Sequence, residues 1–180
     1  MEILPLELDG LRLVRPKVFR DWRGDFVKSF HSPTFEQAGI RLAVREEFFS
    51  VSKLKVVRGM HFQLPPHTQE RLVYCLAGRI LDVVVDLRKS SPTFGRVISR
   101  ELSETNREML FIPAGFAHGF LSLSEGCLVN YLASQPHNPA HDTGILWNTI
   151  DFNWPIQDAE AILSERDQSF VALPDFSSPF

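Results

Sequence analysis

Residues 71–88, RLVYCLAGRILDVVVDLR, decide the fold class of this sequence. They form two apolar runs that meet at Gly78-Arg79, rich in the branched and aromatic residues that favour strands. From Leu81 to Leu87 every odd-numbered residue is leucine or valine, whereas Asp82 and Asp86 fall at even positions. This period of two gives a strand two distinct faces. The two runs are therefore expected to form a hairpin.

Similar strand-like runs occur along the rest of the chain, and helical signals are few. One short helix is predicted after Ser32-Pro33, where an N-cap and a first-turn proline precede Gly39, and another over residues 158–163. Many short strands separated by glycine and proline turns favour an all-β fold, a jelly-roll barrel with short flanking helices. The further predicted strands are Leu11–Val14, Phe48–Ser52, Val97–Leu102, Met109–Ile112 and Cys127–Ala133.

The composition is that of a globular protein with one core. The chain has 180 residues without an internal repeat or linker, which predicts a single domain over residues 1–180. Its hydrophobic content is 44% and its charged content 23%. The net charge of −3 argues against a nucleic-acid partner. No run approaches the roughly 20 apolar residues that a membrane helix needs, so no membrane association is expected.

The cysteines and the N-terminal residues indicate where the protein works. MEILPLELDG lacks the basic and apolar regions of a signal peptide. Cys75 and Cys127 both lie in apolar strand-like runs, where buried, unreactive thiols are expected rather than a disulfide framework. Together these features predict a protein of the reducing cytoplasm.

Two histidine motifs carry the chemistry. In residues 58–63, RGMHFQ, strand alternation puts His61 and Gln63 on one face and Arg58 on the other. The residues alone leave His61 open as a metal ligand, a proton-transfer group or a core residue. Residues 111–120, FIPAGFAHGF, contain the Pro-x-Gly-x-x-His pattern typical of the second motif of cupin barrels, with His118 at its end. Many cupins bind metal through a first motif His-x-His, but Gln63 replaces the second imidazole with an amide, a poor transition-metal ligand. No metal and no other cofactor are therefore expected.

These motifs and their order along the chain resemble the dTDP-4-dehydrorhamnose 3,5-epimerase family, cupin-type sugar-nucleotide epimerases. The resemblance covers nearly the whole chain and implies a metal-independent isomerase that works as a homodimer with exchanged strands. It implies epimerisation of a nucleoside-diphosphate 4-keto-6-deoxyhexose at C3, C5 or both, in the biosynthesis of deoxysugars such as rhamnose for lipopolysaccharide O-antigen. The matching segments are PKVFRDWRGDF (16–26), RGMHFQ (58–63), DVVVDLR (82–88), SPTFG (91–95), IPAGFAHGF (112–120), GILWN (144–148), WP (154–155) and LSERD (163–167).

The resemblance also implies the role of each catalytic residue. His61 matches the base that removes a hydrogen beside the ketone, and Asp167 matches the carboxylate that orients this imidazole. Tyr131 matches the acid that returns a proton to the opposite face of the enolate. Arg71 stands where the family has a lysine, so a positive charge remains near the enolate oxygen.

Further residues match substrate contacts. His118 and Arg58 match sugar and phosphate contacts, while Arg23 and Arg166 match diphosphate contacts. Where the family has a Gln-x-Asn pair for the nucleotide base, this chain has Glu46 and Phe48, so a cytidine or other carrier in place of thymidine is a second hypothesis. Lys28 replaces a glutamate of the family. The full substrate-binding prediction is Arg23, Phe26, Lys28, Glu46, Phe48, Arg58, Gln63, Arg71, His118, Asp142 and Arg166.

Three other functions compete with epimerisation. A ketoisomerase would use the same barrel to move the carbonyl between C3 and C4, but the set of His61, Tyr131 and Asp167 favours epimerisation. A metal-dependent cupin oxygenase is disfavoured by Gln63. A sugar-nucleotide binding module without catalysis would show no hydrogen exchange with solvent. The inverted carbon, the nucleotide base and the final deoxysugar stay open at this point.

Overall fold

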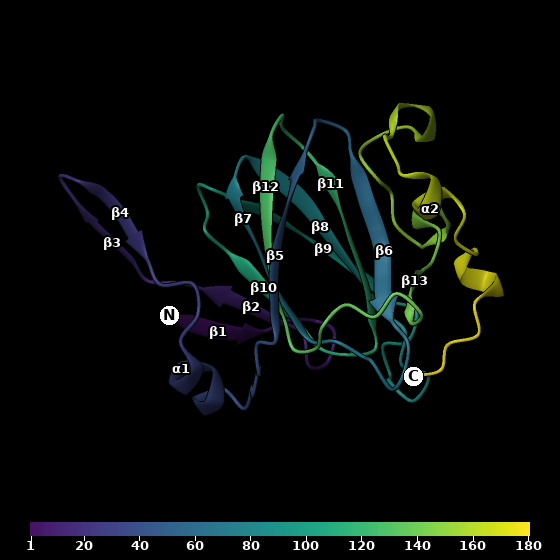
Figure 1. Ribbon diagram of the computed structural model, residues 1–180, viewed down its shortest axis with the longest axis horizontal. Coiled ribbons are helices and arrows are strands. Elements are labelled where there is room, and N and C mark those ends of the chain that lie inside the picture. Colours follow the sequence, from purple (N-terminus) through teal and green to yellow (C-terminus); the bar gives the residue numbers. More distant parts are fainter.

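The computed structural model describes residues 1–180 and contains two facing β-sheets (Figure 1). The first sheet has six strands in the order β1-β2-β10-β7-β12-β5. All of its pairs are antiparallel, and β5, on one edge, pairs only with β12. Its strands are β1 (Glu2–Pro5), β2 (Arg12–Arg15), β5 (Glu46–Ser52), β7 (Arg71–Ala77), β10 (Met109–Ile112) and β12 (Cys127–Ala133).

The second sheet has five strands in the order β13-β6-β11-β8-β9, again all antiparallel. The predicted all-β jelly roll of cupin type is thus confirmed, and the helices are short and lie outside the sheets (Figure 1). None of these helices combines the length and apolar character needed to cross a bilayer. The strands of the second sheet are β6 (Val57–Gln63), β8 (Arg79–Asp86), β9 (Val97–Ser103), β11 (Phe116–Ser122) and β13 (Asp142–Gly144).

The hairpin predicted over residues 71–88 is wrong, although both runs are strands. β7 belongs to the six-stranded sheet and pairs with β10 and β12, whereas β8 belongs to the five-stranded sheet and pairs with β9 and β11. The chain crosses between the sheets at Gly78, whose positive φ of 73° suits the residue without a side chain. Two adjacent strands can thus carry a turn signal between them without pairing with each other.

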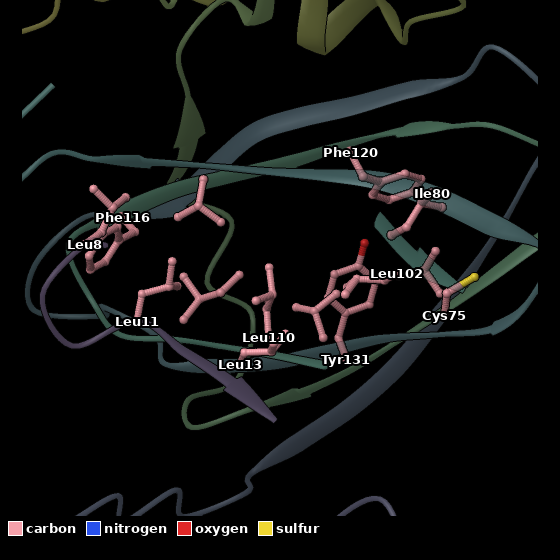
Figure 2. Packing of buried hydrophobic residues seen from close by; sticks show 14 of the residues in the cluster. Leu8, Leu11, Leu13, Cys75, Ile80, Leu102, Leu110, Phe116, Phe120 and Tyr131 are labelled. Atoms are coloured by element: carbon pink, nitrogen blue, oxygen red, sulfur yellow. The ribbon is translucent and has the colours of Figure 1, made fainter. Parts of the chain in front are cut away.

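The main core fills the space between the two sheets (Figure 2). It draws on both sheets: Leu110 and Tyr131 come from the first, and Ile80 and Phe120 from the second. Tyr131 lies among these apolar side chains at 7% exposure. Packing of this core therefore fixes the position of Tyr131.

A second cluster covers the outer face of the five-stranded sheet. Residues of the C-terminal segment, among them Trp147, Trp154 and Phe180, pack on Met60 and Phe62 of β6. This segment contains η1 (Trp147–Thr149), η2 (Asp158–Glu160), α2 (Glu165–Gln168) and η3 (Leu173–Asp175). The helix predicted over residues 158–163 is only the short η2, while α2 was not predicted. Packing of the segment brings α2 beside β6 (Figure 1).

The N-terminal region carries the helix that was predicted and a hairpin that was not. Helix α1 (Ser32–Gln37) buries Phe35 against the outer face of the six-stranded sheet. Strands β3 (Val18–Asp21) and β4 (Gly24–Val27) pair only with each other and project away from the two sheets (Figure 1). The side chains of Phe19 and Phe26 are exposed to solvent, and Trp22 at the tip is 94% exposed.

An irregularity in β6 places the first histidine motif. The register of β11 against β6 shifts between His118 and Phe120, opposite Gly59. A Cβ on Gly59 would lie 2.5 Å from Cα of Gly119, so only two glycines allow the strands to come this close. The predicted alternation breaks here, and Arg58 lines the same cleft as His61 instead of pointing to the opposite face.

Candidate active site

A cleft of about 400 Å³ opens between the two sheets. Side chains from β5, β6, β7, β11 and β12 line it, together with the loop before β13 and helix α2. Its lining is mostly polar and charged, with only two hydrophobic residues. Of the predicted site residues it contains His61, Tyr131, Glu46, Phe48, Arg58, Arg71, His118, Asp142 and Arg166.

The imidazole of His61 is oriented by a buried carboxylate. Its Nε2 lies 2.8 Å from Oδ1 of Asp167, whose second oxygen accepts a hydrogen bond from the backbone N–H of Gly59 at 3.2 Å. Burial of Asp167 opposes its ionisation, yet the hydrogen bond and charge of His61 hold its pKa below the ordinary value. With Nε2–H donated to the carboxylate, Nδ1 of His61 is free to accept a proton.

The two partners of this pair come from distant parts of the sequence. His61 lies on β6, and Asp167 on α2, in the segment that packs over the outer face of the same sheet. Ser164 caps α2, since its Oγ accepts a hydrogen bond from the backbone N–H of Asp167 at 3.1 Å. A second hollow of about 390 Å³ borders the pair on the side of α2. The imidazole therefore lies between two open volumes.

Tyr131 faces the cleft from the opposite sheet. Its ring stacks on Phe48 with 4.7 Å between centroids and 11° between planes. Burial raises the pKa of Tyr131, and the negative charge of Asp82 adds to this, whereas Arg71 opposes it. The phenol therefore stays protonated at neutral pH and is able to donate a proton.

His118 lies across from His61, on the neighbouring strand, and has its own carboxylate partner. The two histidines are paired in the β6–β11 register. Nε2 of His118 lies 2.7 Å from Oδ2 of Asp82, and both side chains are buried. Burial raises the pKa of Asp82, although His118 opposes this shift. The cleft thus holds two imidazoles side by side, each with one nitrogen occupied by an aspartate.

Cationic side chains surround these groups. Arg58 donates to Oγ of Ser52 at 3.0 Å, which ties it to β5. Arg166 forms an ion pair with Asp142. The Nε atom of Arg166 also lies 3.5 Å from Oδ1 of Asp167. Guanidinium groups in such a cleft suit a phosphate-bearing substrate.

Four of the predicted substrate-binding residues lie outside the cleft. Arg23, Phe26 and Lys28 are exposed on or next to the β3–β4 hairpin, and Arg23 is paired with Asp21 at 2.6 Å. Gln63 is buried and its amide anchors loops: Nε2 donates to the carbonyl of His67 at 2.7 Å and Oε1 accepts from the N–H of Asn138 at 2.6 Å.

Three cleft residues had not been singled out as site residues: Ser50, Gln69 and His137. Ser50 was detectable in principle, because it follows Phe48 by two positions on a predicted strand and must share its face. Gln69 lies in a loop before β7, and His137 lies exposed in the loop between β12 and β13. No three His, Cys, Asp or Glu side chains are arranged so that they could hold a metal ion.

Comparisons with known proteins agree on one family. A family model described as dTDP-4-dehydrorhamnose 3,5-epimerase matches residues 5–175. The dTDP-4-dehydrorhamnose 3,5-epimerase of Shigella flexneri is 40% identical over 177 residues, which cover 95% of this chain and 97% of that protein.

Solved structures give the same result. A 3,5-epimerase from Legionella pneumophila in complex with dTDP-4-keto-L-rhamnose superimposes with a TM-score of 0.92 at 34% identity, covering 98% of this chain and 94% of its own. ChmJ, a 3'-monoepimerase from Streptomyces bikiniensis in complex with dTDP-quinovose, gives a TM-score of 0.89 at 32% identity, covering 95% and 87%. The relatives of this chain thus include an enzyme whose name gives epimerisation at two carbons and one whose name gives epimerisation at a single carbon.

Proposed function

We infer the reaction of this protein from one premise: the chain belongs to the dTDP-4-dehydrorhamnose 3,5-epimerase family and is an isomerase. We propose that it epimerises a nucleoside-diphosphate 4-keto-6-deoxyhexose at C3, C5 or both, as a step of deoxysugar biosynthesis. The observation that carries the assignment of roles is the His61–Asp167 pair, whose free Nδ1 shares a cleft with Tyr131. The two free, buried cysteines suit the cytoplasmic location expected from the sequence.

The first half of the reaction is removal of a hydrogen beside the ketone. Nδ1 of His61 takes the proton from C3 or C5, and the electron pair of the broken C–H bond forms a double bond to C4. The ketone oxygen becomes an enolate, whose charge the guanidinium of Arg71 stabilises. This step leaves an imidazolium on His61. The lowered pKa of Asp167 keeps its carboxylate ionised, so Asp167 stabilises this positive charge.

The second half is return of a proton to the opposite face. The hydroxyl of Tyr131 protonates the same carbon as the enolate returns to the ketone, which inverts the centre. Solvent then takes the proton from His61 and restores the one on Tyr131. The reaction is a net isomerisation without electron transfer, and the proposed steps use no metal or redox cofactor.

The β3–β4 hairpin supports a homodimer in which each chain completes the other's site. Arg23, Phe26 and Lys28 match substrate contacts in the family resemblance, but they lie on or next to the β3–β4 hairpin, which projects away from the two larger sheets (Figure 1). Exposed Trp22 and Phe26 would be covered by a second copy. In analytical ultracentrifugation we expect a dimer, and Phe26→Asp should shift it toward monomer with loss of activity. A wild-type monomer with full activity would contradict the dimer.

The nucleotide base is the part of the substrate where this chain differs from the family pattern. Glu46 and Phe48 lie two apart on β5 and both line the cleft. One carboxylate oxygen of Glu46 accepts the N–H of His137 at 2.6 Å, which leaves the other for a ligand. A carboxylate accepts hydrogen bonds only, so Glu46 is able to accept one from an exocyclic amine, which cytosine has and thymine lacks.

Calorimetry tests this choice of carrier. If Glu46 selects the carrier, CDP binds more tightly than dTDP, and Glu46→Gln reduces the difference. Clearly tighter binding of dTDP would show that Glu46 does not select the base, and the carrier printed in the names of the relatives would stand for this enzyme too.

Proton NMR in D2O tests the reaction itself. With dTDP- or CDP-4-keto-6-deoxyglucose, wild-type protein should exchange the hydrogen at C3, C5 or both. His61→Asn should abolish exchange at both carbons, whereas Tyr131→Phe should retain abstraction but impair inversion. Wild-type protein that exchanges neither hydrogen would refute epimerisation, and equal activity in all three proteins would refute the residue assignments.

A further inference from the structure

Arg71 is a half-buried cation without a carboxylate partner. It begins β7 at the floor of the cleft, and it takes part in no ion pair. Burial lowers the pKa of its guanidinium, while the more distant charges of Tyr131 and Asp142 oppose this. Buried arginines are commonly neutralised by an acid, because an uncompensated buried charge is costly. This charge is instead available to a ligand in the cleft.

The side chain of Gln69 holds this guanidinium in place. Oε1 of Gln69 accepts two hydrogen bonds from Arg71, from Nε at 3.1 Å and from Nη2 at 2.8 Å. The amide is itself fixed, since its Nε2 donates to the backbone carbonyl of Gln135 at 2.7 Å. This second bond also determines which end of the amide faces Arg71, so the acceptor cannot be exchanged for a donor.

Because the side chain of Gln69 is a neutral acceptor, it leaves the positive charge of Arg71 uncompensated, whereas a carboxylate would neutralise that charge. Gln69 occupies two of the five N–H groups of Arg71 and leaves three for other partners, together with the full positive charge. Because Gln69 holds the edge formed by Nε and Nη2, the guanidinium plane is fixed. A lysine at this place would offer a rotating point charge, which an amide two residues away could not orient in the same manner.

On the basis of the proposed reaction, we propose that Gln69 is a positioning residue that directs the free N–H groups of Arg71 toward the enolate oxygen. Stabilisation of developing charge depends on donors that are aligned before the reaction occurs. Misplacement of such a group by about 1 Å can cost roughly 100-fold in rate. The effect of Gln69 must therefore appear in turnover and must depend on the arginine.

A double-mutant cycle tests this dependence. Gln69→Leu keeps the approximate volume and removes both acceptor bonds, so we expect kcat to fall roughly 10- to 100-fold with little change in KM. In an Arg71→Lys background, the same substitution should change kcat by less than about 3-fold, because lysine lacks the Nε and Nη2 groups that Gln69 binds in Arg71. Gln37→Leu, on an exposed face of α1, is the matched control and should behave as wild type.

The outcomes separate this proposal from the proposed function. Wild-type protein that exchanges neither C3 nor C5 hydrogen would refute the reaction, whatever Gln69 does. With an active wild type, an unchanged kcat in Gln69→Leu, or an equal loss in the wild-type and Arg71→Lys backgrounds, would overturn the positioning role.

A second variant covers the case in which Gln69→Leu does not fold. Gln69→Glu keeps the shape and the acceptor for Arg71, but it compensates the positive charge of Arg71 and loses the donor to the carbonyl of Gln135. We expect a folded protein, checked by thermal unfolding, with a larger loss of kcat than Gln69→Leu. Folded Gln69→Glu with wild-type turnover would show that the charge of Arg71 is not needed and would also overturn the proposal.

Discussion

Asp82 and Asp86 lie four residues apart on β8, and both are completely buried. Asp86 accepts five hydrogen bonds from Arg88, Ser91 and Thr93. Burial opposes ionisation of Asp86, but these donors hold its pKa at about 2. Asp82 differs from Asp86 in both respects. Its only hydrogen-bond partner is His118, and its Oδ1 has no partner within the protein. Burial raises the pKa of Asp82.

The two carboxylates show how a buried charge serves different purposes. The donors of Asp86 close the turn after β8, where Arg88 also bonds the carbonyl of Asp9 at 2.8 Å. Such a saturated ion stabilises the fold. Asp82 is left partly unsatisfied beside the cleft, where it holds His118 and acts on the pKa of Tyr131. We infer that Asp86 contributes to stability, whereas Asp82 costs stability and contributes to turnover.

The largest effect is expected at the saturated carboxylate. Asp86→Ala leaves the buried part of Arg88 and two hydroxyl groups without their acceptor, so the free energy of unfolding should fall by about 3–5 kcal/mol. Urea denaturation followed by circular dichroism measures this. A loss below about 1 kcal/mol would mean that the network stabilises the protein no more than a surface ion pair does. Asp86 and Asp82 would then not differ in their contribution to stability.

The pH dependence of unfolding should reveal the same group. Because the pKa of Asp86 is lower in the folded protein than its ordinary 3.8, its contribution is present above about pH 4 and is lost as the pH falls toward 2. This lowering of the pKa corresponds to about 2 kcal/mol. Urea denaturation at intervals from pH 5 to pH 2 should show this loss, and Asp86→Asn should show a correspondingly shallower dependence.

Removal of a single donor should have a smaller effect. Thr93→Val keeps the shape of a buried side chain and deletes the hydrogen bond of 2.7 Å to Oδ2 of Asp86, together with the contact of 2.9 Å to Oγ of Ser91. Because the acceptor is charged and has other donors, we expect a loss of about 1–2 kcal/mol. Thr34→Val on α1, where the hydroxyl contacts only His31, provides a control that should change little. Equal losses in both variants would argue against a special role of the network.

The smallest effect on stability is expected at Asp82. Asp82→Asn removes a buried charge whose second oxygen has no partner, so the free energy of unfolding should change by less than about 1 kcal/mol in either direction. Turnover should nevertheless fall, because His118 loses the carboxylate that orients its imidazole in the cleft. Rates of C3 and C5 exchange in D2O measure this. A stable variant with unchanged exchange would show that Asp82 has no part in the reaction.

The sequence predicted the type of fold better than its pairing. Strands β10 and β12 have the predicted bounds, because each is a mainly apolar run, interrupted in β12 only by Asn130. The alternation in residues 81–87 correctly separated two faces of β8, but it does not say that β7 lies in another sheet. Pairing depends on contacts between distant segments, which a local pattern does not contain.

The candidate site shows the same limit. His61 and Asp167 are 106 positions apart in the sequence. Only the family resemblance predicted that they lie close together. Alternation placed Arg58 wrongly, because the register shift opposite Gly59 arises from the packing of two strands. Gln69 gave no signal at all, since its function depends on the direction of one hydrogen-bonded side chain.

The protruding β3–β4 hairpin has a consequence for mixtures of two defective proteins. If each hairpin serves the cleft of the other chain, as proposed, Phe26→Asp and His61→Asn are damaged in different halves of the same composite site. A hybrid of the two would pair the intact hairpin of one with the intact cleft of the other. Mixing two inactive preparations under conditions that allow subunit exchange should then restore part of the activity, a form of complementation that independent monomers do not show.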